Sequence, residues 1–266
     1  MIWLERILGL FLIIGLVSCA SQPQAVAQVA PTVSPSSTLT TTSLPKPSIT
    51  PTYSLTVTRM PSVTPTVTPV FKMCSPLPLH PLEELPQIIG DPYKPPPPGK
   101  EERHHGIDFG YWHYEDRDSM LGEPLQAVFS GKVAASIQDK YPYGNMVMIE
   151  TPVEDLPADL AELIGISPGE SLYILFAHMN KAPLVGLGDM VEACQAMGEV
   201  GMSGNTDIPH LHLETRLGPA GAVFESMRFY DTQATQLEMD NYKLWRTSGE
   251  FRHFDPMTLF AYQPIP

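Results

Sequence analysis

Short apolar segments separated by turn residues recur along the second half of the chain. Leu172 to Ala177 is apolar at nearly every position, which is typical of a strand that is buried on both faces. The other segments have the length of short strands, and most have Gly, Ser or Pro directly at one end or both. They comprise residues 125–129, 132–137, 145–150, 196–200 and 211–213. This pattern predicts an all-β domain.

One short helix is predicted among these strands, at residues 157–164, and Gly165 ends it. It belongs to an insertion, residues 152–171, that separates two strands. About 50 residues follow Arg216. For them we expect an extra β-hairpin and a C-terminal wrap, with no functional role.

The N-terminus has a different pattern. Residues 7–17 form an apolar run that is shorter than the roughly 20 residues of a membrane-spanning helix and fits a secretory signal. The sequence Leu16-Val17-Ser18-Cys19 resembles the lipobox of bacterial lipoproteins, whose Cys is acylated after cleavage of the preceding bond. The resemblance implies that Cys19 anchors the protein, outside the cytoplasm, to a bacterial membrane. An uncleaved anchor or an ordinary signal peptide is the alternative.

Residues 20–70 are dominated by Thr, Ser, Pro, Val and Ala and contain no Asp or Glu. They offer no periodic apolar face, so we expect a disordered tether that is partly polyproline II, with a rise of about 3.1 Å per residue. The predicted organisation is a signal peptide at 1–18, a lipidated Cys and tether at 19–72, and a folded domain at 73–266.

The charges are concentrated in the folded part. The chain has a net charge of −13, and residues 1–72 contain four basic and one acidic side chain, so residues 73–266 carry −16. An acidic domain argues against nucleic-acid binding, which requires a basic face. Three Cys residues are too few for a disulfide-based scaffold.

Four histidines lie in patterns that suggest metal chemistry. His104 precedes Asp108 by four residues, and His178 ends a predicted buried strand. His210 and His212 are two residues apart on a predicted strand, so their side chains point to the same face, and Leu211 and Leu213 point to the core.

These residues resemble those of the lysostaphin/LytM-type zinc metalloendopeptidases, which cleave peptide bonds in bacterial peptidoglycan. The His-x-Gly-x-Asp motif of that family matches 104–108, and its His-x-His motif matches 210–212. An isolated His after an apolar strand matches His178, and glycines match at 188, 198, 201 and 204. The resemblance covers about residues 100–216. It implies an antiparallel β-sheet domain with a central groove, a duplicated hybrid motif in that family.

The resemblance also implies the roles of the site residues. His104, Asp108 and His212 would bind one zinc ion and leave a fourth position for water, as in catalytic zinc sites. His178 and His210 would act as general base or oxyanion stabiliser, and the sequence does not decide which is the base. His105 is an alternative ligand to His104.

Several other residues have two interpretations. Glu214 is either a partner of a ligand ring or a surface carboxylate. The loop 111–118 and the insertion 152–171 either help to select the peptide or are surface segments. Asn205 is expected in a turn, and the remaining histidines are expected to be superficial or structural: His80, His113 and His253.

With Cys19 lipidated, Cys74 and Cys194 are the remaining thiols. An extracytoplasmic location favours a disulfide between them, and two free thiols are the alternative.

We therefore expect a membrane-tethered, monomeric zinc endopeptidase that acts on peptidoglycan peptides. The alternatives are a non-catalytic wall lipoprotein that binds the wall or activates another hydrolase, and a secreted peptidase for other proteins.

Overall fold

The computed structural model of the chain describes residues 71–229 and 231–263. The predicted signal peptide, Cys19 and the tether up to residue 70 lie outside the described residues. Within this part of the chain, no helix has the length and apolar character needed to span a membrane.

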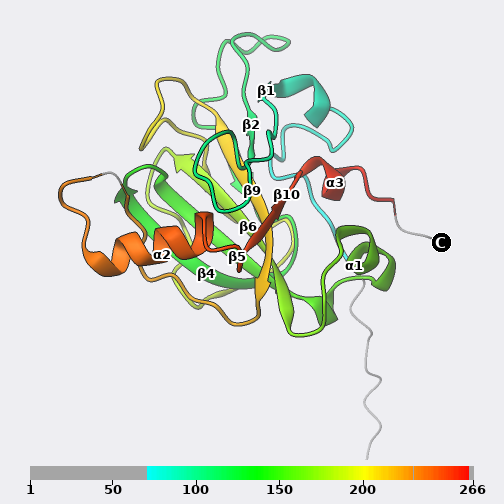
Figure 1. Cartoon of the computed structure of the whole chain (residues 1–266). Helices are drawn as coiled ribbons and strands as arrows, with labels where there is room; N and C mark the ends of the chain where they lie inside the picture. Colours follow the sequence, from blue (N-terminus) through cyan, green and yellow to red (C-terminus); the bar gives the residue numbers. More distant parts are fainter. Residues whose placement is uncertain (1–70, 230, 264–266) are drawn as a thin grey trace, which may run out of the picture. The chain divides into compact units, whose positions relative to one another are not determined.

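Strands are the main regular secondary structure of the described residues (Figure 1). In chain order the elements are the 3₁₀ turn η1 (Leu85–Ile88), β1 (Ile89–Asp91), β2 (Ile107–Phe109), β3 (Pro124–Gln126), β4 (Gly131–Lys140), β5 (Gly144–Pro152), the 3₁₀ turn η2 (Val153–Asp155), α1 (Ala158–Ile164), β6 (Glu170–Met179), β7 (Met190–Val191), β8 (Ala196–Glu199), β9 (Leu211–Pro219), α2 (Gln236–Arg246), β10 (Arg252–Phe254) and α3 (Met257–Phe260).

The main sheet is antiparallel. Its strand order is β1-β2-β9-β6-β5-β4-β7, and β10 pairs with β9 beside this series. A smaller sheet consists of β3 and β8. The prediction of an antiparallel β domain is thus confirmed, and the six apolar segments all contribute to strands.

The two faces of the central strands carry different cores. Along β6, Leu172, Ile174 and Phe176 pack into one apolar cluster with α1 and α3. Tyr173 and Leu175 pack into a second cluster on the other face, together with residues of α2. Because neighbouring strand residues point to opposite faces, both faces of β6 are covered, as its continuous apolar run predicts. Figure 1 shows α2 on one side of the sheet and α1 and α3 on the other.

The expectation of a single helix is wrong. Where a hairpin was predicted after Arg216, β9 continues to Pro219, and the eleven-residue helix α2 follows before β10 returns to β9. The apolar signal of α2 is weak because its buried residues include only two aromatic side chains, Tyr242 and Trp245. Its start was readable, since Thr235 and Glu238 form a capping box.

A disulfide joins Cys74 to Cys194, 120 residues further along the chain, with Cα atoms 5.5 Å apart. The backbone N–H of Cys74 donates to the carbonyl of Val128, and Phe71 packs on Phe129 with ring centroids 5.4 Å apart. The start of the described chain is therefore attached to the core.

Candidate metal centre

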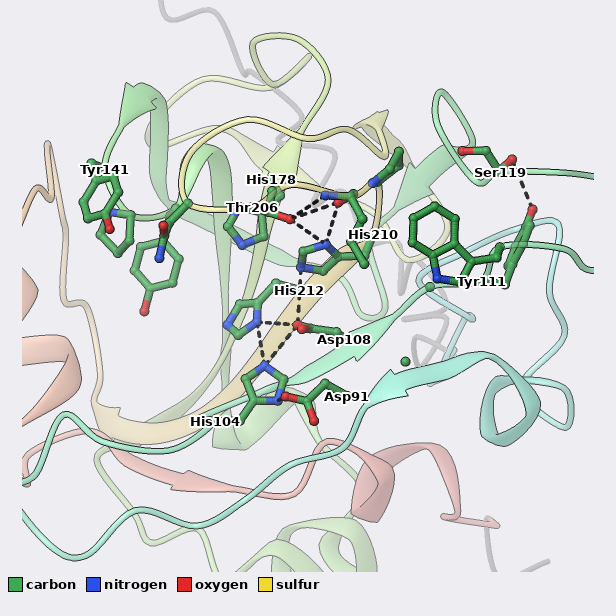
Figure 2. A pocket seen from close by; sticks show the side chains of 18 of the residues that line it. Asp91, His104, Asp108, Tyr111, Ser119, Tyr141, His178, Thr206, His210 and His212 are labelled. Atoms are coloured by element: carbon green, nitrogen blue, oxygen red, sulfur yellow. Dashed lines mark hydrogen bonds and ion pairs between the residues drawn. The ribbon is translucent and has the colours of Figure 1, made fainter.

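Three side chains converge between β2 and β9 (Figure 2). Asp108 of β2 is paired with His212 of β9 in the antiparallel register, and His104 lies four residues before Asp108. His212 Nδ1 is 2.7 Å and His104 Nε2 is 3.0 Å from Asp108 Oδ1. The two ring nitrogens are 3.1 Å apart. The strand register thus brings together residues that are 104 and 108 positions apart.

The opposite nitrogen of each ring has its own acceptor. His104 Nδ1 donates to the carbonyl of Pro92 at 3.0 Å, and His212 Nε2 donates to Glu214 Oε1 at 3.2 Å. These bonds direct His104 Nε2 and His212 Nδ1 toward Asp108, to which they donate in the metal-free protein, and a bound metal would take their lone pairs instead. Protein metal sites orient their histidine ligands in this way.

The donor set fits zinc. Two imidazole nitrogens and one carboxylate oxygen are ligands that catalytic zinc sites use, with further positions left open. Gly106 permits the close approach of the strands, since a Cβ atom there would lie 2.5 Å from the carbonyl oxygen of Leu213 and 3.0 Å from Cε1 of His212. The glycine of the His-x-Gly-x-Asp motif is therefore required by the packing of the ligand strand.

Two further histidines face this cluster (Figure 2). His178 Nδ1 donates to the carbonyl of Ser203 at 2.7 Å, and His210 Nδ1 donates to the carbonyl of Ile208 at 3.0 Å. Their rings lie 4.8 Å apart, and His210 Nε2 is 3.5 Å from Asp108 Oδ1. In both rings Nε2 is left as a proton acceptor. His178 has a φ of 59°, a left-handed conformation that is unusual outside glycine and often occurs at functional sites.

The pKa values of two histidines and the carboxylate in this cluster shift in different directions. Burial, with the nearby rings of His212 and His210, lowers the pKa of His178 to about 3, so this ring is neutral at pH 7. Burial disfavours the charged form of His212, but hydrogen bonds to Asp108 and Glu214 outweigh it and raise the pKa of His212 to about 9. Burial also opposes ionisation of Asp108, yet the hydrogen bonds from His104 and His212 hold the pKa of this carboxyl well below its usual range.

The cluster opens into a pocket of about 700 Å³. In Figure 2, Tyr141 lies on one side of the histidines, and Tyr111 and Ser119 lie on the opposite side. Trp112 also lines the pocket although its side chain is 75% exposed. The lining comprises Gly90, Asp91, Glu101, His104, Asp108, Gly110, Tyr111, Trp112, Asp118, Ser119, Tyr141, Pro142, Tyr143, His178, Asn205, Thr206, Ile208, Pro209, His210, His212, Tyr242 and Arg246.

Residues 102–223 match the sequence profile of peptidase family M23. In this segment the chain is similar to peptidase family M23. The catalytic domain of lysostaphin from Staphylococcus simulans is 22% identical, over 69% of this chain and 99% of that domain, with a TM-score of 0.40. The catalytic domain of the prophage-encoded M23 protein EnpA from Enterococcus faecalis is 24% identical, over 51% of this chain and 85% of that domain, with a TM-score of 0.36. A search of curated proteins found no match to the chain.

All five predicted metal-ligand and catalytic positions lie within the M23 segment, but the pocket extends beyond it. Tyr242 and Arg246 of α2 line the pocket, although no role was expected for the region after Arg216. Short-range sequence patterns did not indicate them, because only the tertiary fold brings α2 to the candidate site.

The loop 111–118 and the insertion 152–171, which were both considered for substrate selection, differ in their position relative to the pocket. Tyr111, Trp112 and Asp118 of the loop line the pocket, whereas none of the described residues of the insertion 152–171 does. The insertion helix α1 instead packs near α3, and the hydroxyl of Tyr262 donates to Asp159 at 2.9 Å.

The alternative ligand His105 lies apart from the candidate metal centre. It is fully buried, and its Nδ1 accepts a hydrogen bond from Arg216 Nη2 at 2.9 Å. Burial lowers the pKa of His105 to about 3. The ring of His253 packs on this ring at a tilt of 50°, with centroids 5.4 Å apart, so both histidines are structural.

The structure also places the other polar residues that the sequence analysis singled out. His80 is fully buried and 3.0 Å from Glu123 Oε2, whereas His113 is exposed beside Asp118. Asn205 lies in a loop, where its N–H donates to the carbonyl of Pro142 at 2.8 Å. Glu214 is fully buried, so the surface interpretation of this carboxylate is wrong.

Proposed function

We propose that this M23 domain is a zinc metalloendopeptidase that hydrolyses peptide bonds in the stem or cross-link peptides of bacterial peptidoglycan. The carrying observation is the convergence of His104, Asp108 and His212, with two further histidines facing the same pocket. The match of residues 102–223 to peptidase family M23 supports peptidase chemistry. The resemblance to lysostaphin/LytM-type enzymes supports a wall substrate, and the lipobox-like sequence at Cys19 supports attachment to a bacterial membrane.

The residues divide the chemistry between them. His104, Asp108 and His212 would hold the zinc ion, which supplies an acidified water and polarises the scissile carbonyl when bound. His210 or His178 accepts the proton of the attacking water at Nε2. The same ring then gives this proton to the leaving amine nitrogen as the C–N bond breaks. The hydrogen bonds at Nδ1 keep both rings in the orientation that this transfer requires.

The pocket shape supports a peptide substrate. It reaches from Tyr141 on one side of the histidines to Tyr111 on the other, so an extended chain can pass over the site with residues on both sides of the scissile bond. The exposed indole of Trp112 offers an apolar contact at one end.

The test uses the full chain in detergent, purified peptidoglycan of several chemical types, and added zinc or a chelator. Mass spectrometry of the soluble products should reveal new peptide ends that depend on zinc and are absent with His210→Ala. Cleavage of a non-wall protein alone would contradict the wall substrate. No cleavage by a protein with one tightly bound zinc would favour the alternative, a wall-binding or activating lipoprotein.

A further inference from the structure

The carboxylate of Glu214 lies at the centre of a buried network behind the metal centre. It follows His212 by two residues on β9 and lies on the same face of the strand. Its Oε1 accepts the Nε2–H of His212 at 3.2 Å, the hydroxyl of Tyr143 at 2.6 Å and Arg246 Nη1 at 2.8 Å. The same oxygen that holds the ring of His212 is therefore held by α2.

The second oxygen has an equally complete set of donors. Glu214 Oε2 accepts two hydrogen bonds from Arg216, from Nε at 3.0 Å and from Nη2 at 2.8 Å. It also accepts the indole N–H of Trp245 at 3.0 Å. Six hydrogen bonds, from five side chains, thus fix the position and the plane of this carboxylate.

The two donors from α2 are themselves immobilised. Trp245 is fully buried and packs on Phe251 and Phe224, with ring centroids at 5.4 and 5.9 Å. The guanidinium of Arg216 lies 4.7 Å from the centre of the indole. Arg246 also forms an ion pair with Glu101 at 3.1 Å. Both donors come from outside the segment that matches family M23.

We propose that Trp245 and Arg246 are positioning residues for the metal ligand His212, which they orient by fixing the carboxylate of Glu214. The proposal rests on the proposed zinc site. It makes α2 a part of the metal centre, in a region whose sequence lies beyond the family segment.

The expected size of the effect follows from the number of steps between α2 and the metal. Loss of a partner that bonds directly to a histidine ligand weakens metal binding about 10- to 100-fold. Trp245 acts one bond further away, and Glu214 keeps its other donors. For Trp245→Phe we therefore expect about tenfold weaker zinc binding, at the lower end of that range.

The experiment measures the zinc dissociation constant of the full chain by competition with a chromophoric chelator. Its variants are Trp245→Phe, which removes the indole N–H, and Arg246→Lys, which keeps the charge and removes the fork of donors. Phe224→Leu is the matched control, because this residue packs on Trp245 without a hydrogen bond to Glu214. Urea unfolding checks that each variant folds. If one of the two α2 variants does not fold, the other still tests the proposal.

A second readout does not depend on zinc. In the metal-free protein, ¹⁵N NMR of the imidazole groups should reveal a hydrogen-bonded Nε2–H on His212, and its signal should shift in Trp245→Phe and remain in Phe224→Leu. Equal zinc affinities and unchanged signals in Trp245→Phe and Phe224→Leu would overturn the proposal. A wild-type protein that binds no zinc would contradict the proposed function instead, and the NMR result would still decide whether α2 orients His212.

Discussion

Among the described residues, two clusters that combine histidine with a carboxylate can be compared, and one of them is arranged as a metal site. In the metal centre, His104 and His212 meet Asp108. In the second cluster, here called the Glu123 cluster, Glu123 contacts His80, Tyr111 and Arg117. The residue types are similar, so composition alone does not distinguish the two clusters.

The difference lies in what surrounds each carboxylate. Glu123 Oε1 accepts the hydroxyl of Tyr111 and Arg117 Nη1, the latter at 3.1 Å, so a cationic side chain and a hydroxyl already satisfy this oxygen. Among the described residues, no Lys or Arg contacts Asp108, and its neighbours are imidazole nitrogens, which coordinate a metal once they have lost their protons. A metal site is thus recognised by donor atoms that converge without a Lys or Arg among them.

Removal of a ligand should have the largest effect. His212→Ala takes away one of three donors and should weaken zinc binding by several orders of magnitude and reduce peptide cleavage at least about a thousandfold. Chelator competition and product analysis check this result. In contrast, Glu123→Gln should leave zinc affinity within a few-fold of the wild type. A His212→Ala protein that retains one tightly bound zinc would contradict the ligand assignment.

Substitution of His210, which is not one of the three proposed ligands, should reduce the catalytic rate without loss of zinc. His210→Ala should lower kcat by about 10²- to 10⁴-fold, the range for a lost acid–base group, while the zinc content stays at one per chain. Metal analysis of the purified variant and its steady-state kinetics provide the measurement. The matched variant His178→Ala then identifies the base: it is the residue whose loss removes the limb of the pH–rate profile on the acidic side.

The Glu123 cluster should matter for stability. Glu123→Gln removes the charge of a buried carboxylate that faces Arg117 and His80. Breaking a fully buried ion pair costs about 3–5 kcal/mol, and because the Arg117 side chain is 26% exposed, the cost here should lie at or below the lower end of that range. We expect a fall of this order in the free energy of unfolding in urea. Glu115→Gln is the control, since Glu115 is 69% exposed and 4.0 Å from Arg117, and exposed pairs of this kind contribute about 0–1 kcal/mol. Equal losses in both variants would show that the Glu123 cluster is no more than a surface contact.

The smallest effect is expected at the capping box of α2, away from both clusters. Hydrogen bonds at Thr235 and from Ser226 and Lys140 lower the pKa of Glu238 to about 2, against the opposing effect of burial. A lowered pKa stabilises the fold above the unfolded value near 4.3, and this contribution disappears as the pH falls toward 2. Glu238→Gln should therefore cost about 1 kcal/mol at pH 7, as a lost cap does, and little at pH 2. Urea unfolding at several pH values checks this, and a loss that does not vary with pH would contradict it.

The central strands were predictable because burial on both faces leaves a continuous apolar run, as in β6. The helix α2 was not predicted from apolar periodicity, since Tyr242 and Trp245 are its only buried apolar side chains. Its capping box was present in the sequence, but a capping box alone does not specify a helix.

The convergence of the candidate ligands was predictable, because the resemblance points to motif residues that the strand register then aligns. Asp108 opposite His212 is an example. The partners of Glu214 were not predictable in this way. Trp245 lies 31 residues and Arg246 lies 32 residues beyond it, and only the packing of α2 on the sheet brings them together.

The disulfide between Cys74 and Cys194 also has a mechanical consequence. Consider a force that pulls on the chain before Phe71 while the C-terminal end is held fixed. This force can be transmitted from Cys74 to Cys194 through the covalent disulfide bond. The loop between them then carries no load along its backbone. His104, Asp108 and His178 all belong to that loop, so a pull on the N-terminal side would leave this part of the site unstretched.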